Sequence, residues 1–265
     1  MNMFLHELKA YRKSTIIWTC SLIAFVVLFL SMFPAFSKEV ETFKKLMEGF
    51  PEPVRKALGL SVDSMSSILG FYAYVFLYIT LCGAIQAMNL GTSIISKETS
   101  GKTVDFLLSK PVTRSKIMTS KLIAAVTCLV ITNATYLVVA SIMASIVKTV
   151  DYSYKIFFMI SITLFFVQLM FLALGVIISV VVSKIKSVIP ISLGTVFAFF
   201  FIGMLASTSR DGALRYITPF KYFDTSYIIK NSSYDTPFII IEIAFIIVTI
   251  TASYFVFAKK DIHAV

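Results

Sequence analysis

Charged residues are scarce in this sequence. Asp, Glu, Lys and Arg make up 14% of its 265 residues, whereas 58% of the residues are hydrophobic and the mean hydropathy is +0.88. An ordinary globular domain is about 25% charged and about 45–50% apolar. A soluble fold of this length could not bury so much apolar surface, so we expect a membrane protein.

The chain also has few of the residues on which catalytic and metal sites depend. Its three cysteines, Cys20, Cys82 and Cys128, all fall within apolar segments, where cysteine behaves as a small apolar residue. Its two histidines, His6 and His263, lie at opposite ends of the sequence and form no metal-ligand spacing. An intramembrane enzyme needs a metal cluster or a nucleophile with its base inside the membrane. We therefore predict no catalytic residue, no metal site and no enzymatic activity.

A phosphate-binding loop is missing as well. That loop has a glycine, four further residues and then Gly-Lys-Ser/Thr. Gly101, Lys102 and Thr103 match its end, but the position of the first glycine is occupied by Ser96. We therefore expect this chain to bind neither ATP nor any other cofactor itself.

Long apolar runs dominate what is present. Five segments of 23 to 33 residues contain no charged side chain, and a sixth of 16 residues extends back to Thr236 across one carboxylate, Glu242. A spanning helix needs about 20 apolar residues, and the absence of two-residue alternation favours helices over a barrel. The predicted fold is all-α, one transmembrane domain over residues 1–265. Its six spans are expected at approximately 15–36, 67–95, 122–147, 156–182, 188–206 and 237–257.

The charges predict how these spans are oriented. The connections that share a side with both termini carry 13 Lys and Arg in 48 residues, against 11 in 60 residues for the other side. Because basic residues favour the cytoplasmic side, we expect both termini in the cytoplasm. The net charge is +10, but the basic residues lie in short connections beside the spans. This distribution argues against nucleic acid as a partner.

Three segments outside the spans show helical patterns. Phe4, Leu8 and Tyr11 share one helical face, which suits either an amphipathic N-terminal helix in the cytoplasmic interface or an extension of the first span. A similar stripe that includes Val40 and Phe43 predicts a short helix in the outer connection 37–67. The second outer connection, 207–235, is rich in aromatic residues, and we expect it to lie on or in the outer leaflet.

The cytoplasmic connection after the second span predicts a short helix. Thr103 can cap it and Asp105 suits its first turn, while Val104 and two leucines share a face and Pro111 ends it. Exposed leucines flanked by basic residues need a partner. The residues alone leave two candidates, a groove on another protein and the membrane surface.

This connection resembles the signature of the ABC type-2 transporter permease family. The family pattern is approximately a glutamate, two or three residues, Gly-Thr, then Leu-Leu-Ser-x-Pro-Val-Ser-Arg and a later lysine. The sequence matches it with Glu98, Gly101, Thr103, Leu107, Leu108, Ser109, Pro111, Val112, Arg114 and Lys121. Two departures are that Lys102 separates Gly101 from Thr103 and that Thr113 replaces the usual serine.

The resemblance implies a half-transporter. Two permeases, as a homodimer or a close heterodimer, would each rest on a separate cytoplasmic ATPase that binds ATP and magnesium. The residues that couple to the ATPase would then be Glu98, Gly101, Thr103, Val104, Leu107, Leu108, Ser109, Pro111 and Arg114. The expected function is export through a bacterial cytoplasmic membrane, with the substrate left open. A secondary transporter or channel is the alternative, although it would usually need several ionisable groups inside the membrane.

A few polar or small residues inside the spans are candidates for function or packing. Glu242 is the one intramembrane carboxylate, and Tyr74 and Tyr78 share a helical face, so all three are candidates for a substrate path. Gly83 and Gly91, with an alanine midway, follow the small-residue spacing that lets helices approach closely. We interpret Asn89, Asn133 and Gln168 as interhelical hydrogen-bonding groups.

Overall fold

The computed structural model describes residues 3–57, 65–100, 112–182, 185–208 and 212–259. This described part is helical and contains no strand, and six of its helices are long and apolar enough to cross a membrane. The predicted all-α membrane fold is therefore confirmed. The long helices are α1 (Met3–Lys38), α4 (Ile68–Ser100), α6 (Arg114–Val147), α7 (Tyr154–Val181), α8 (Val188–Thr208) and α10 (Thr236–Lys259).

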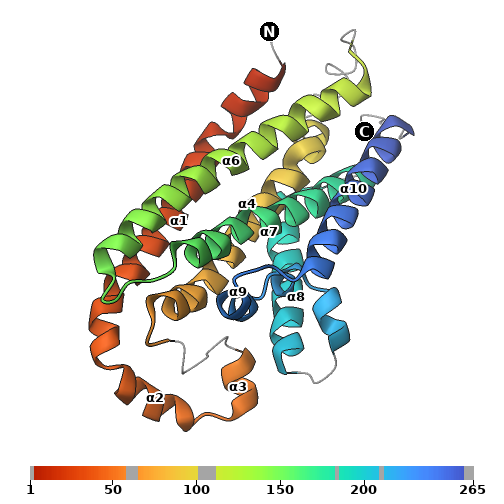
Figure 1. The fold of residues 1–265 in the computed structure, drawn as a ribbon. Helices are drawn as coiled ribbons and strands as arrows, with labels where there is room; N and C mark the ends of the chain where they lie inside the picture. The colour runs from red at the N-terminus through yellow and green to blue at the C-terminus, as the bar shows by residue number, and fades with distance from the viewer. Residues whose placement is uncertain (1–2, 58–64, 101–111, 183–184, 209–211, 260–265) are drawn as a thin grey trace.

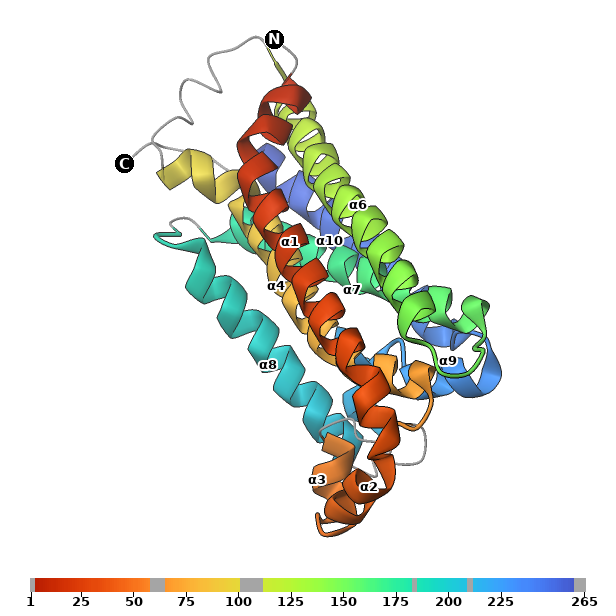
Figure 2. The ribbon, with the colours of Figure 1, turned by 90° about the vertical axis from the view of Figure 1, so that its left-hand side faces the viewer.

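The short elements gather at one end of the bundle (Figures 1 and 2). They are α2 (Val40–Glu48), α3 (Glu52–Ala57), the 3-10 turns η1 (Gly212–Tyr216) and η2 (Pro219–Lys221), and α9 (Thr225–Asn231). The beginning of α1 and the end of α10 lie at the other end, which we call the terminal end (Figure 1). The expected helix in the connection 37–67 is present as α2.

The N-terminal residues are part of α1 and form no separate helix. The helix runs without a break from Met3 to Lys38, and Glu7 and Tyr11 are buried against other helices. Because these side chains pack into the bundle, the segment cannot lie flat in the membrane interface. The structure therefore has the second of the two predicted arrangements, an extension of the first span. The predicted interfacial helix at the N-terminus is wrong.

The aromatic connection before α10 packs on protein. The Tyr216 and Tyr222 rings lie 5.1 and 5.3 Å from that of Phe238 on α10, and the Phe223 ring lies 5.4 Å from that of Phe166 on α7. The Tyr222 hydroxyl donates to the Tyr216 carbonyl at 2.7 Å. These contacts explain why the connection is so rich in aromatic residues.

Two helix pairs form the centre of the bundle, α4 with α7 and α1 with α6. In the first pair the backbones touch at glycines. A Cβ on Gly175 would lie 2.7 Å from the Thr92 nitrogen, and a Cβ on Gly91 would collide with the Leu172 carbonyl. The close approach predicted from the small-residue spacing is confirmed. The helices α8 and α10 lie outside these pairs, with α8 on α4 and α10 on α7 and α6.

Candidate functional site

The cytoplasmic connection predicted to couple to an ATPase begins where α4 ends and finishes where α6 begins. Most of its predicted residues lie outside the described part of the chain, namely Gly101, Thr103, Val104, Leu107, Leu108, Ser109 and Pro111. Glu98 belongs to the last turn of α4, and Arg114 is the first residue of α6. The Thr113 hydroxyl accepts from the Lys116 backbone N–H at 3.3 Å and so caps the beginning of α6.

The beginning of α6 is tied to the end of α10. The Arg114 guanidinium donates to the Phe257 carbonyl at 3.2 Å, and the Thr119 and Tyr254 hydroxyls lie 2.8 Å apart. Carbonyls in the last turn of a helix have no partner within that helix, so a guanidinium suits this position. Arg114 therefore anchors α6 to its neighbour, in addition to the ATPase contact predicted for it.

The end of α4 is tied to α1. The Ser93 hydroxyl donates to the Tyr11 hydroxyl at 3.2 Å, and the Lys97 ammonium lies 5.4 Å from the centre of the Tyr11 ring. A cation over an aromatic face is attracted by the ring's negative potential. The end of α4 is thus held against α1, and the beginning of α6 is held against α10.

A buried ion pair joins α1 and α6 near the same end. The Lys121 Nζ lies 2.7 Å from the Glu7 Oε1, and the exposed fractions of the two side chains are 0% and 4%. The sequence comparison matched Lys121 to the family pattern but gave Glu7 no role. One signal could have found it, because Glu7 is the only carboxylate before Glu39 and lies four residues from Tyr11 on the same helical face.

Hydrogen bonds between side chains cross the middle of the bundle. The Thr19 and Thr132 hydroxyls lie 2.9 Å apart, and the Gln86 amide donates to Thr132 at 2.9 Å. Gln168 in turn donates to the Gln86 carbonyl oxygen at 3.1 Å and accepts from Asn133 at 2.5 Å. The network links α1, α6, α4 and α7, so Asn133 and Gln168 are interhelical groups as predicted, whereas Gln86 was overlooked. The third predicted group, Asn89, is different, because its side-chain oxygen is buried without a hydrogen-bond partner among the described residues.

A second polar cluster lies between the middle of the bundle and the α2 end. The Tyr72 hydroxyl is 2.7 Å from that of Tyr136 and 2.8 Å from that of Ser161, and all three residues are buried. Buried hydroxyls in a membrane span need such partners because no water is available to them. The cluster connects α4, α6 and α7.

The candidates for a substrate path lie on two different helices. Tyr74 and Tyr78 are half-buried on α4, with hydroxyls 3.4 Å apart. Asn89, Ser93 and Lys97 continue the same helical face toward the terminal end, so the most accessible strip of α4 carries polar groups. Glu242 is buried on α10, which packs on α7 and α6. The structure therefore extends the tyrosine face but does not join it to Glu242.

The connection before α10 is held by charge as well as by aromatic rings. The Arg215 guanidinium lies 2.9 Å from the Asp235 carboxylate and 3.9 Å from the centre of the Phe238 ring. Burial lowers the pKa of Lys221, and burial together with the nearby Glu242 carboxylate raises the pKa of Tyr222. These groups hold a folded cap against α10, and the geometry gives them no catalytic arrangement.

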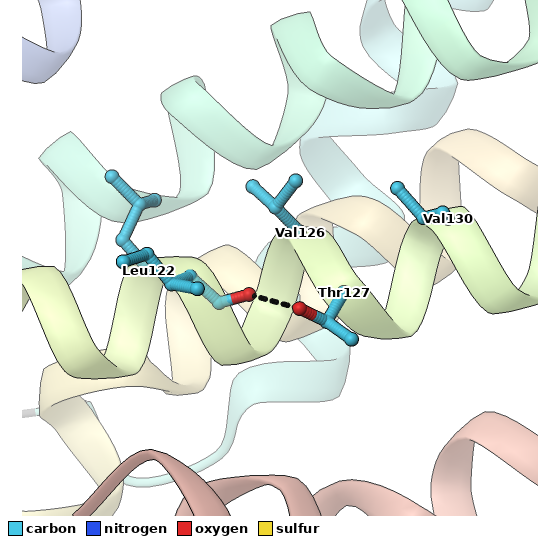
Figure 3. A pocket seen from close by; sticks show the side chains of 5 residues that line it. Leu122, Val126, Thr127 and Val130 are labelled. Carbon is cyan, nitrogen blue, oxygen red and sulfur yellow. Dashed lines mark hydrogen bonds between the residues drawn. The ribbon is translucent and has the colours of Figure 1, made fainter.

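One hollow of about 290 Å³ lies on the surface of α6 (Figure 3). It is lined by Leu122, Ile123, Val126, Thr127 and Val130. The Thr127 hydroxyl donates to the Ile123 carbonyl at 2.8 Å, so the one polar side chain is already satisfied. The other four lining side chains are apolar, so the surface of the hollow is largely apolar.

Two comparisons with known proteins bear on this arrangement. Residues 1–262 match the family model described as ABC-2 family transporter protein. A search of curated proteins found no match.

Among the described residues, no three His, Cys, Asp or Glu side chains are grouped so that they could hold a metal ion.

Proposed function

This chain belongs to the ABC-2 family of transporter proteins, so it is an ABC transporter permease, and we propose that it exports its substrate with ATP hydrolysed by a separate cytoplasmic subunit. The observation that carries this proposal is the family match over residues 1–262. The connection between α4 and α6 would be the element that docks on the ATPase.

The surroundings of the connection support this assignment. It leaves α4 and enters α6 at the terminal end, and those two helices belong to different central pairs. A partner that moved the connection would therefore act on both pairs at once. Lys97 and Lys116 are exposed at its two ends and could meet acidic groups on the partner.

The orientation follows from the same proposal. Both ends of the described chain lie at the terminal end together with the boundaries of the connection (Figure 1). We place that end in the cytoplasm, in agreement with the density of basic residues. A cysteine introduced at exposed Lys148, at the opposite end of α6, should react with an impermeant thiol reagent on intact cells. Labelling only after the cells are broken would reverse the orientation.

A substrate path along the accessible strip of α4 is part of the proposal. The strip runs from Tyr74 and Tyr78 to Lys97, and a second copy of the permease would close it from the other side. Rings with hydroxyl groups can contact both the apolar and the polar parts of an amphipathic molecule. Glu242 lies on another helix, α10, and stays a separate candidate for substrate contact.

The test of the proposal is a change of both leucines in the predicted coupling helix, Leu107→Ala with Leu108→Ala. Burying one leucine is worth about 1.5–3 kcal/mol, so losing two should weaken docking more than about a hundredfold. An affinity-tagged permease from its own host should copurify with an ATPase in equal number, and the double variant should lose it. Native mass spectrometry and the rate of ATP hydrolysis measure both effects.

A matched control separates docking from folding. Leu205→Ala removes an exposed leucine from α8, far along the chain from the connection, and should keep the ATPase. If the double leucine variant retains its ATPase at the unaltered ratio, the connection contacts lipid and the coupling assignment is wrong. A permease that purifies without any ATPase would favour a secondary transporter or channel.

A further inference from the structure

The two helices joined by the cytoplasmic connection are held by different neighbours. The α4 backbone contacts that of α7 at Gly91 and Gly175, which leaves no room for a shift. The α6 helix packs along α1 instead. A movement of the connection would therefore act on both α4 and α6. Whether α7 moves with α4, and α1 with α6, depends on how firmly each pair of helices is joined.

The ion pair between Glu7 and Lys121 is the firm joint of the α1–α6 pair. Both side chains are buried, and the second carboxylate oxygen of Glu7 has no hydrogen-bond partner among the described residues. Well-packed apolar residues of similar volume would hold two helices at least as tightly, because burying two charges costs much of what their attraction returns. The ion pair instead fixes the position of α1 along α6, because separating the two charges in an apolar surrounding is strongly unfavourable.

The contacts between the two pairs are of another kind. From the terminal end to the α2 end they include Ser93 with Tyr11, Gln86 with Thr132, Asn133 with Gln168, and Tyr72 with Tyr136. Hydrogen bonds between polar side chains in membranes contribute little each on average, because other partners can replace them. A boundary made of such bonds can shift where a glycine contact or a buried ion pair cannot.

We infer that Glu7 and Lys121 are positioning residues that make α1 and α6 move as one unit against α4 and α7. The inference rests on the proposed function, because it is the ATPase acting on the connection that would drive the movement. Lys121 lies two turns into α6 from its capped beginning, and Glu7 passes its displacement on to α1. Neither residue needs to contact the substrate.

Two crosslinks that share one cysteine test the inference. In a variant without Cys20, Cys82 and Cys128, Thr19→Cys with Thr132→Cys bridges α1 to α6 within one unit. Gln86→Cys with the same Thr132→Cys bridges α4 to α6 across the boundary. Both pairs start from side chains in hydrogen-bond contact. Because the glutamine contact is made by its ε nitrogen, beyond the position of a cysteine sulfur, the second pair takes a longer bifunctional thiol reagent than the first. The readout is ATP hydrolysis by the permease–ATPase complex, with and without the reagent.

We expect the first crosslink to leave the hydrolysis rate within about twofold and the second to lower it about tenfold or more, because it blocks a required movement. The first crosslink should also restore a complex weakened by Glu7→Gln, since it replaces the lost joint. A fall in the rate with the first crosslink, or no fall with the second, overturns the inference. If the untreated complex contains no ATPase, the proposed function has failed instead.

A measurement on the permease alone keeps the ion pair testable in that case. Glu7→Gln and Lys121→Met should each lower the thermal unfolding midpoint in detergent by about 10 °C, since each breaks the buried ion pair. Exchanging the charges, Glu7→Lys with Lys121→Glu, should recover at least half of that shift. If the exchange recovers nothing, the charges do not hold α1 to α6 and the inference is wrong.

Discussion

The α4–α7 and α1–α6 interfaces join helices of similar length and composition in different ways. The α4–α7 interface brings the two backbones into contact at Gly91 and Gly175, and hydrogen bonds such as Gln168–Gln86 lie beside this contact. The α1–α6 interface has a side-chain hydrogen bond as well, between Thr19 and Thr132 at mid-length, and differs in having the buried Glu7–Lys121 ion pair near the terminal end. In lipid the hydrophobic effect does not draw apolar helices together, so close packing and polar contacts must do so.

This difference indicates which amino-acid substitutions each interface can tolerate. A contact between backbones has no freedom to adjust, so an added methyl group must push the helices apart. A polar contact can exchange partners as long as no charge is left alone. An added methyl group at a backbone contact should therefore cost more than the loss of one shared amide, and an exposed ion pair should matter least. Three predictions examine this in order of decreasing effect.

The largest effect is expected from Gly91→Ala and Gly175→Ala. A Cβ at either position meets backbone atoms of the facing helix, and backbone cannot give way as a flexible side chain can. Overpacking of this severity should cost about 3 kcal/mol or more. Thermal unfolding in detergent and the yield of monodisperse protein measure it. The matched control is Gly194→Ala on α8, where no atom lies within 4 Å of the added Cβ, and it should leave both unchanged. Equal tolerance at all three sites would contradict the role of shape.

A smaller effect is expected from Gln168→Leu, which removes the central member of the hydrogen-bond network. The amide of Gln168 bonds to Gln86, to Asn133 and to the Gly83 carbonyl, and the partners would be left buried without it. The loss should be about 1–3 kcal/mol, with each partner free to find another group.

The control for the network is Thr135→Val on the exposed face of α6. The Thr135 hydroxyl bonds only within its own helix, to the Ile131 carbonyl, as far as the described contacts show. Its replacement should leave the unfolding midpoint unchanged. A Gln168→Leu variant as stable as this control would mean that the network contributes nothing to the assembly of the four helices.

The smallest effect is expected from Lys148→Ala, which breaks an exposed ion pair. The Lys148 Nζ lies 2.6 Å from the Asp151 carboxylate, about as close as in the Glu7–Lys121 pair, but both groups are in contact with solvent. Exposed ion pairs contribute little because water screens the charges, so the midpoint should change by about 1 °C or less. A shift as large as that of Lys121→Met would show that distance, and not burial, sets the strength of these pairs.

Several features of the protein follow from the sequence alone. Six apolar runs long enough to cross a bilayer determine the number of spans, because backbone groups in lipid must be satisfied within a helix. The pattern from Glu98 to Lys121 pointed to the transporter family, and the family match agrees. The spacing of Gly83 and Gly91 predicted close packing on α4. The coupling residues 101–111 lie outside the described residues and stay a prediction.

Only the tertiary structure decided which helices are partners and which polar side chains meet. Glu7 and Lys121 are 114 positions apart, and Thr19 and Gln86 reach the same Thr132 from different helices. Hydropathy could not reveal this, because a side chain facing lipid and one facing another helix are equally apolar. The insertion of a helix into the membrane depends on how apolar its segment is, and this can be read from the sequence. Pairing depends on the shapes and hydrogen bonds of facing surfaces, which exist only once the helices have come together.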